Sequence, residues 1–277
     1  MDLFWGILIT AGAVAVSVTA MLLVRRRAPA GSYFADGDRA SGVFGVLATG
    51  FSVLLGFIVF LAFTSYDQSR SGAETEALVV FQQIETAQLL PPRISRPLTG
   101  DLVCYARSVV HSEWPRMEDG TLGSAFNPWG VAMFQTIRSY EPVTNRQQAA
   151  YSQWLSQTSA REEARRDRVH GAAGVIPTSV WIVLFLIGSV IFAYMLFFAD
   201  PEEGPVTQAM LMGAVTVVIV AMFLVIRALD TPFHPGVGGL RPVAMERTLG
   251  QMDRGLAIVG LGSAALPCDA SGAALRP

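Results

Sequence analysis

Four apolar runs, each more than 20 residues long and free of charged side chains, dominate the hydrophobic pattern: residues 3–24, 43–63, 176–198 and 206–226. A bilayer core of about 30 Å requires about 20 apolar residues in a helix that rises about 1.5 Å per residue. Helices of soluble proteins rarely remain apolar on every face over such a length. The pattern therefore predicts an all-α integral membrane protein with four transmembrane helices.

Polar residues return in residues 64–175, the only large segment outside the four runs. Up to Pro91 this segment contains no proline and repeats apolar residues at spacings of three and four, so the second membrane helix is predicted to continue to Leu90. Residues 43–90 would then form a rod of about 72 Å, with more than half of it outside the hydrocarbon. The apolar face consists of Ala73, Ala77, Val80, Ile84 and Ala87.

Three more helices are predicted in this segment, near residues 98–112, 128–140 and 145–171, with Asn145 as the N-cap of the last. Together with the extended second helix they would form a helical extramembrane stalk. Large aromatic residues are expected to form its core, namely Trp114, Trp129, Tyr140, Tyr151 and Trp154. The predicted parts are two spans in 1–63, the stalk in 64–175, two spans in 176–229 and a partly flexible tail in 230–277.

Composition agrees with a membrane protein, since 52% of the residues are hydrophobic and only 15% are charged. A net charge of -2 provides no basic field, so nucleic-acid binding is excluded. All 20 basic residues are arginine, which indicates a GC-rich bacterial genome and hence a bacterial inner membrane. Cys104 and Cys268 fit neither a disulfide scaffold nor a zinc motif, so two ordinary free thiols are expected.

The arginines leave two membrane orientations open. Those in the short first loop favour a cytoplasmic loop and an N-terminus outside: Arg25, Arg26, Arg27 and Arg39. Those in the stalk and tail favour the opposite orientation: Arg70, Arg161, Arg165, Arg166, Arg168, Arg241 and Arg247. Because long segments cross a membrane largely regardless of their charge, the N-terminus is predicted to lie outside.

Catalytic motifs are missing from the sequence. His111, His170 and His234 are scattered, and no HExxH, P-loop, GxSxG or GxGxxG pattern accompanies them. The spans contain no acidic residue or histidine that could relay protons or couple ions. We therefore expect no enzyme, no ion-coupled transporter, no metal site and no cofactor.

The order of several motifs resembles one family. The second span reads GFSVLLGFIVF at residues 50–60, Glu113-Trp114 lies midway along the stalk, and the fourth span ends in LDTPF at residues 229–233. In these motifs the chain resembles the bestrophin-like bacterial membrane proteins, which are grouped with the bestrophin anion channels. His234-Pro235 departs from the glycine that this family commonly has after LDTPF. The resemblance implies a homo-oligomer, and bestrophins proper are pentameric channels whose second helices line a pore with an aromatic neck.

If the second span lined a pore, its axial residues would be Gly56, Phe60, Phe63 and Asp67, at spacings of four, three and four. Phenylalanine rings repeated around an oligomer would form a dewetting constriction for small inorganic ions. Alternatively, these phenylalanines face lipid or neighbouring helices, and a ring of Asp67 would favour cations over anions. Glycines of this helix indicate close helix contacts: Gly42, Gly45, Gly50 and Gly56.

Two charged clusters complete the candidate residues. Arg161, Arg165 and Arg168 share one face of the last stalk helix and would attract anions if repeated by symmetry; the alternative is a solvated or headgroup-facing surface of mixed charge. At the end of the fourth span, Arg227 and Asp230 are expected to pair at the hydrocarbon edge. Pro232 and Phe233 follow, and a structural role in ending and anchoring the helix is favoured over an ion path.

Two classes of function follow. In the first, a ring of identical chains conducts small ions passively, with anions implied by the resemblance. In the second, the protein is a membrane-anchored helical interaction or sensing module that does not conduct. The expected partners are the lipid bilayer, further copies of the chain and small inorganic ions.

Overall fold

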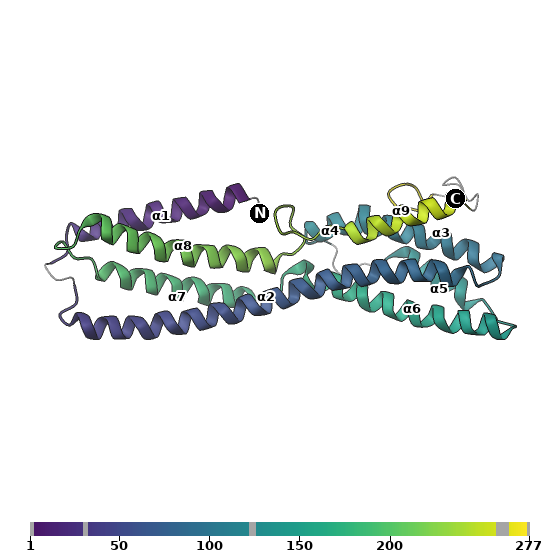
Figure 1. Cartoon of the computed structure of the whole chain (residues 1–277), viewed down its shortest axis with the longest axis horizontal. Coiled ribbons are helices and arrows are strands. Elements are labelled where there is room, and N and C mark those ends of the chain that lie inside the picture. The colour runs from purple at the N-terminus through teal and green to yellow at the C-terminus, as the bar shows by residue number, and fades with distance from the viewer. Residues whose placement is uncertain (1–2, 30–32, 122–125, 259–265, 276–277) are drawn as a thin grey trace. The chain divides into compact units, whose positions relative to one another are not determined.

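The computed structural model describes residues 3–29, 33–121, 126–258 and 266–275, and every named secondary-structure element in this part of the chain is a helix (Figure 1). Four of them are long and apolar enough to cross a membrane: α1 (Leu3–Arg25), α2 (Gly37–Ala87), α7 (Thr178–Phe197) and α8 (Pro205–Asp230). The predicted all-α membrane fold with four spans is thus confirmed.

The chain divides into two compact units. The membrane unit comprises Met1–Ser65, Gly174–Thr231 and Pro235–Gly238, and the extramembrane unit comprises Tyr66–Ala173, Pro232–His234 and Gly239–Pro277. Helix α2 contributes residues to both units. The segment after residue 230 is divided between the units, and the predicted membrane boundaries at residues 63, 175 and 229 stay predictions.

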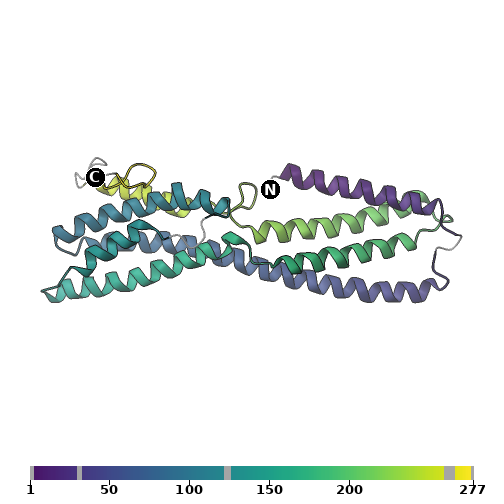
Figure 2. The same cartoon turned by 180° about the vertical axis from the view of Figure 1, so that it is seen from behind.

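Within the membrane unit, α1 packs along α8, and α7 lies between α8 and α2 (Figure 2). Ser17 and Thr216 join α1 to α8 through a hydrogen bond of 3.0 Å between their hydroxyl oxygens. Gly213 of α8 faces Val14 of α1, where an added Cβ would make an ordinary van der Waals contact at 3.6 Å. Small residues and hydrogen bonds are the usual means of helix association in lipid, where burial of apolar surface gives no driving force.

One face of α2 packs against α7 and α8 through apolar side chains. These buried residues are Phe51, Leu55 and Ile58 from α2, Leu184 and Ile191 from α7, and Ile226 from α8. Most side chains on the four spans are exposed within this single chain. Exposed apolar side chains over a span's length are stable in lipid and not in water.

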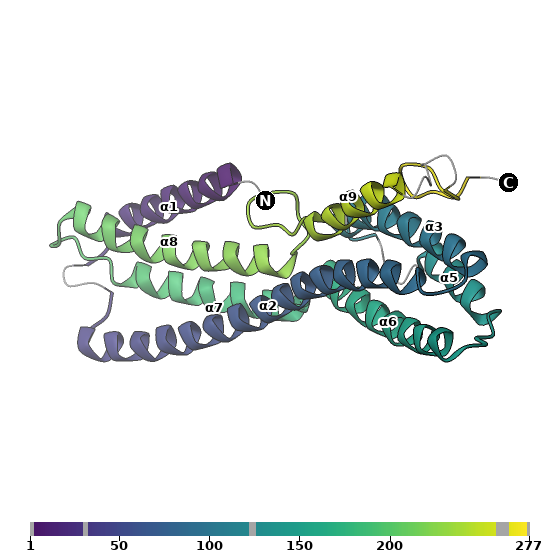
Figure 3. The same ribbon diagram turned by 45° about the vertical axis from the view of Figure 1, so that its right-hand side comes forward.

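The extramembrane unit gathers its helices around the later part of α2 (Figure 3). They are α3 (Pro92–Ser108), the π-helix η1 (Val109–Glu113), α4 (Trp114–Glu118), α5 (Pro128–Arg138), α6 (Asn145–His170), the 3₁₀ helix η2 (Gly171–Ala173) and α9 (Val243–Ile258). The predicted aromatic core is confirmed, with Trp114, Trp129, Tyr140 and Trp154 buried and Tyr151 packed against them.

Local chemistry explains where the helix ends differ from prediction. Helix α3 begins at Pro92, because a proline in the first helical turn lacks only an N–H that would be unpaired there anyway. Helix α6 is capped by Thr144 rather than by the predicted Asn145, and Gln147 completes a capping box with it. Helix α2 ends at Ala87, three residues before the predicted end.

Gly72 sets the contact between α2 and α6. A Cβ at this position would overlap the backbone N of Arg168 and would lie 2.8 Å from the carbonyl O of Ala164. Only glycine permits this close approach of two helix backbones. The approach carries the side chains of α6 into the core of the extramembrane unit.

The C-terminal tail differs most from prediction. Cys104 and Cys268 form a disulfide with their Cα atoms 5.7 Å apart, so the expectation of two free thiols is wrong. Gly272, at φ +80°, lies against Ser108, and its carbonyl accepts a 2.7 Å hydrogen bond from Trp129 Nε1. Residues 266–275 are therefore attached to the core by a disulfide, a hydrogen bond and a close contact, whereas residues 259–265 lie outside the described part of the chain.

Candidate functional site

An exposed face of α2 carries the predicted pore-lining residues. Phe60 and Phe63 are 63% and 53% exposed, and Gly56 and Asp67 are exposed as well. They lie away from the packed face of Phe51, Leu55 and Ile58, which is a consequence of helical periodicity. The structure thus places all four on one continuous surface of the helix that no part of the described chain covers.

This surface, which we call the α2 stripe, continues toward the start of the helix. Its members are exposed and follow one another at spacings of three and four: Gly42, Gly45, Thr49, Val53, Gly56, Phe60, Phe63 and Asp67. A Cβ added at Gly42, Gly45, Gly50 or Gly56 would meet nothing within 4 Å. The predicted close contact at these glycines is therefore not made within the chain, and the stripe is open to a second molecule or to solvent.

After the uncharged part of α2 that follows Asp38 and Arg39, charged side chains return one turn beyond the aromatic part of the stripe. Asp67 is exposed, and Arg70 Nε lies 3.2 Å from Glu74 Oε1 in an exposed i,i+4 ion pair. Such a surface pair contributes little to stability. Acidic and basic side chains thus alternate along this part of the helix.

A second cluster of functional side chains is buried in the extramembrane unit. Arg168 from α6 is 0% exposed and pairs with Glu76 from α2 and with Glu113 from η1, with a distance of 2.6 Å between its Nη2 and Glu113 Oε2. Tyr105 donates a 2.5 Å hydrogen bond to Glu76 Oε1. Arg165 lies 3.0 Å from Glu113 Oε1. We call these five residues the buried ion-pair cluster.

The cluster is balanced in charge because two carboxylates meet two guanidinium groups. Burial by itself would raise the pKa of Glu113, but Arg168 and Arg165 hold the pKa of this carboxyl below its ordinary value. Burial and the Glu76 carboxylate raise the pKa of the Tyr105 hydroxyl, which therefore stays protonated as a donor. Burial opposes the charge of Arg168, yet Glu76 and Glu113 raise its pKa above the ordinary value.

Arg161 occupies a neighbouring buried position. Its Nη1 donates a 2.9 Å hydrogen bond to Gln83 Oε1, and its Cζ lies 5.0 Å from the centre of the Tyr105 ring. The interpretation of Arg161, Arg165 and Arg168 as a solvated or headgroup-facing surface is therefore wrong. Arg161 also pairs with Glu162, whose side chain is 44% exposed, and Arg165 keeps 14% of its own side chain exposed, so attraction of anions by these arginines stays a prediction.

Sequence reasoning missed the carboxylates of this cluster. A signal was present, since Glu76 interrupts the apolar face formed by Ala73, Ala77 and Val80. A charge within a buried stripe requires a buried partner of opposite charge. Glu113 gave no comparable signal, because it lies in the π-helix η1. The i→i+5 hydrogen bonds of a π-helix rotate the following residues away from the face that α-helical spacing predicts for them.

Asp230 has different partners from those predicted. Its Oδ1 accepts hydrogen bonds from the backbone N–H groups of Val175 (2.8 Å) and Ile176 (2.9 Å), and the described structure shows no ion pair with Arg227. Asp230 is buried and accepts hydrogen bonds from the backbone N–H groups of the turn that precedes α7, whereas Arg227 is exposed. The contacts agree with a structural role at the end of the fourth span, with the loop before α7 as the element that Asp230 anchors.

Pro232 and Phe233, the last two residues of the LDTPF motif, belong to the extramembrane unit. The carbonyl of Pro232 accepts a 2.7 Å hydrogen bond from Leu240 N, which closes a loop over residues 232–240. Phe233 is buried and packs edge-on against Trp114 with their ring centres 5.3 Å apart. Phe233 therefore contributes to the core.

Comparisons with known proteins agree with this architecture. A family model described as the Bestrophin-like domain matches residues 3–244. Crystal structures of point mutants of a bacterial bestrophin homologue from Klebsiella pneumoniae are similar at 12% identity; one has a TM-score of 0.68 and covers 88% of this chain and 98% of its own. A second mutant of the same homologue has a TM-score of 0.64, with 93% and 98% covered. No curated protein sequence matches the chain.

Proposed function

Since the chain belongs to the Bestrophin-like family, we propose that identical copies of it assemble into a ring and conduct small ions, anions first among them, through a pore lined by the α2 stripe. The observation that carries the proposal is the stripe itself, which is open along its whole length within one chain. A stripe that faced only lipid would need neither glycines nor a carboxylate. Around a symmetry axis, the glycines would leave space for a pore, and the phenylalanines would narrow that pore.

Phe60 is proposed to form the narrowest hydrophobic ring. Aromatic rings in a pore hinder ions by expelling water, so a smaller side chain at every subunit widens and wets the constriction. We expect Phe60→Ala to raise halide flux severalfold over wild type in liposomes that contain the purified protein. Phe4→Ala serves as the matched control, because Phe4 is 70% exposed on α1 and lies outside the stripe.

The flux assay can also contradict the proposal. Equal background flux from wild type, Phe60→Ala and Phe4→Ala would remove conduction and would leave the membrane-anchored module. A flux that Phe60→Ala raises for cations but not for halides would keep the pore and would assign the selectivity to the exposed Asp67 carboxylates.

We further propose that the protein lies in a bacterial inner membrane with its N-terminus and its extramembrane unit on the outer side. Disulfides persist in oxidising compartments and are rare in the cytosol, so the Cys104–Cys268 bond supports an external position. Arg25 ends α1 and Arg26 and Arg27 follow in the short loop after it, and short arginine-rich loops stay in the cytoplasm. The two arguments are independent and favour the same orientation.

Labelling of intact cells tests this orientation. Both native cysteines are in the disulfide, so a cysteine introduced at an exposed position is the only thiol available. We expect a membrane-impermeant maleimide to label Gln148→Cys, on α6, in intact cells, and to label Glu202→Cys, before α8, only after permeabilisation. The reverse pattern would place the extramembrane unit in the cytoplasm.

A further inference from the structure

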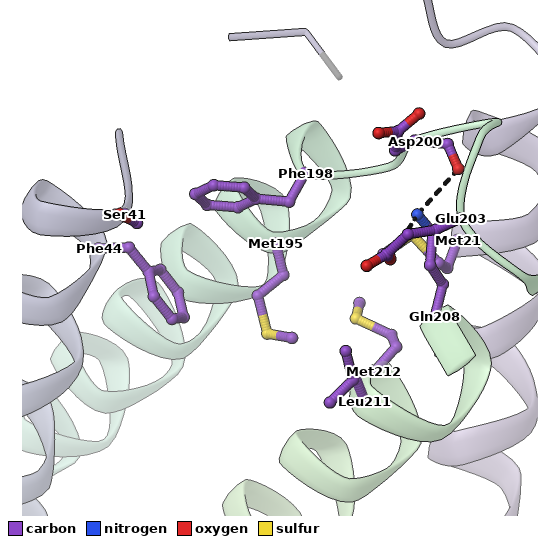
Figure 4. Close-up of a pocket in the computed structure, with 10 residues that line it drawn as sticks. All are labelled: Met21, Ser41, Phe44, Met195, Phe198, Asp200, Glu203, Gln208, Leu211 and Met212. Atoms are coloured by element: carbon purple, nitrogen blue, oxygen red, sulfur yellow. Dashed lines mark hydrogen bonds between the residues drawn. The ribbon is translucent and has the colours of Figure 1, made fainter. Parts of the chain in front are cut away.

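Two pockets in the described part of the chain differ in their chemistry. The pocket in the membrane unit, with a volume of about 450 Å³, is lined mainly by apolar side chains, among them Phe44, Met195 and Met212 (Figure 4). Lipid chains are as apolar as these side chains and can fill such a pocket without being recognised. The pocket in the extramembrane unit has a volume of about 340 Å³ and is lined mostly by polar side chains. Polar groups in a pocket orient a ligand and select it.

Three separate segments build this second pocket, which we call the polar pocket. They lie within residues 108–116, at the end of α3 and in η1 and α4, within residues 126–128, at the start of α5, and within residues 271–274 of the tail. The π-helix η1 places the exposed His111 close in sequence to the buried Glu113, and both line the pocket. Because π-helical turns are rare and frequently lie at functional sites, this wall is a candidate for binding.

Covalent and hydrogen bonds hold the tail in place as one wall of the polar pocket. The Cys104–Cys268 disulfide attaches the tail to α3. The backbone N–H groups of Ser271 and Ala273 then donate hydrogen bonds of 2.8 Å and 3.0 Å to Asp269 Oδ1, which fixes the turn that lines the pocket. A wall that is ordered before binding lowers the entropic cost of binding a ligand.

The carboxylates at the polar pocket have partners within the protein. Glu113 lines the pocket, but its Oε1 lies 3.0 Å from Arg165 Nη2 and its Oε2 lies 2.6 Å from Arg168 Nη2. Asn127, which is 6% exposed, donates a further 3.0 Å hydrogen bond to Glu113 Oε1. Asp269 accepts the hydrogen bonds of the tail. Neither carboxylate therefore needs a cation from solution.

Two basic side chains of the polar pocket have no such partner. Arg116 and His111 are exposed, line the pocket and form no ion pair with any described residue. The guanidinium group of an arginine has a planar fork of N–H donors that matches two oxygens of a carboxylate or a phosphate. Ser108 and Ser112 add hydroxyl groups that can donate hydrogen bonds to the same oxygens. The unpaired positive charge selects an anion.

We propose that the polar pocket binds a small molecule through a carboxylate or phosphate group. Arg116 and His111 hold the oxyanion, and Phe126 and Pro128 contact the apolar part of the molecule. The pocket volume of about 340 Å³ lies within the range of about 300 to 1,000 Å³ that is usual for small-molecule sites. All the lining residues belong to the extramembrane unit, so binding there does not depend on conduction along the α2 stripe.

Calorimetry with the full-length protein in detergent tests this binding. The probes are benzoate, phenyl phosphate and benzamide, which share a phenyl ring and differ in the charge of the group attached to it. Charge-assisted hydrogen bonds predict that at least one anion binds about ten-fold more tightly than the neutral benzamide. The anion that binds more tightly identifies the ligand as a carboxylate or as a phosphate. If neither anion binds more tightly than benzamide, the proposal is overturned.

Two variants locate the site, one by charge and one by volume. Arg116→Gln should abolish the preference for the anion, whereas Arg138→Gln, which changes an exposed arginine of α5 outside the pocket, should retain it. Ala274→Trp should fill the pocket and weaken the binding of the anion about ten-fold or more, whereas Ala270→Trp, in the same tail but outside the lining, should not. All four positions are exposed, so none of these changes is expected to unfold the protein. An undiminished preference in Arg116→Gln, or undiminished binding in Ala274→Trp, would overturn the proposal.

Discussion

Replacing Arg168 with methionine is expected to destabilise the extramembrane unit by about 3 to 5 kcal/mol. The substitution removes the cation that lies between Glu76 and Glu113, and both carboxylates stay buried. Glu113 keeps Arg165 as a partner, but among the described residues Glu76 keeps only the hydroxyl of Tyr105. An uncompensated buried carboxylate is far more costly than the intact pair is stabilising.

Unfolding of the purified protein in detergent measures this loss, followed by tryptophan fluorescence. Trp114 is a suitable reporter, because the centre of its ring lies 5.9 Å from Arg168 Cζ. Arg166→Met is the matched control, since Arg166 is exposed on the same helix and should change stability by less than about 0.5 kcal/mol. Equal stability of the two variants would contradict the expected cost of leaving the Glu76 carboxylate buried without a cation.

A double-mutant cycle separates the pair from its surroundings. Glu76→Gln in the Arg168→Met background removes the carboxylate that the first substitution left without a cation. The double variant should therefore lose less stability than the sum of the two single variants, with an interaction energy of about 0.5 to 3 kcal/mol. Strict additivity would argue that Arg168 acts through Glu113 alone.

Removal of the disulfide should have the second large effect. Cys104 and Cys268 are separated by 164 positions in the sequence, so the bond closes a long loop in the unfolded chain. Loops of this size correspond to a stabilisation of up to about 5 kcal/mol in the chain-entropy description. We expect the double variant Cys104→Ala, Cys268→Ala to unfold at a clearly lower temperature than wild type.

The same variant should release the tail. Residues 266–275 are held by the disulfide, by the hydrogen bond of Gly272 to Trp129 and by the contact of Gly272 with Ser108. Limited proteolysis should therefore cleave the tail of the double variant faster than that of the wild type, and a reductant should reproduce this in the wild type only. Equal cleavage rates would show that packing alone holds the tail.

The membrane spans were predictable because they need no partner. A run of about 20 apolar residues is stable as a helix in lipid whichever neighbours it has, so composition and length suffice. The same holds for the α2 stripe, because Gly56, Phe60, Phe63 and Asp67 fall on one face by helical geometry alone. What the stripe faces depends on other molecules and stays a prediction.

Pairings between distant residues were not predictable in the same way. The spacing of Arg161, Arg165 and Arg168 showed that they share a face but not that this face is turned toward Glu76 and Glu113. The close crossing at Gly72 decides that orientation. Likewise, Asp230 was the expected partner of Arg227 because the two are near in sequence, yet two backbone N–H groups more than 50 positions away are nearer in space.

Hydrophobic periodicity was thus enough to establish a four-span helical protein, the continuation of α2 beyond the membrane and the aromatic core of the extramembrane unit. These features depend on interactions within a few residues or on the solvent, and both can be read along the chain. Tertiary structure alone decided the buried ion-pair cluster, the disulfide and the role of Asp230. Each of these joins segments whose proximity is created by packing, and packing is a property of the whole fold.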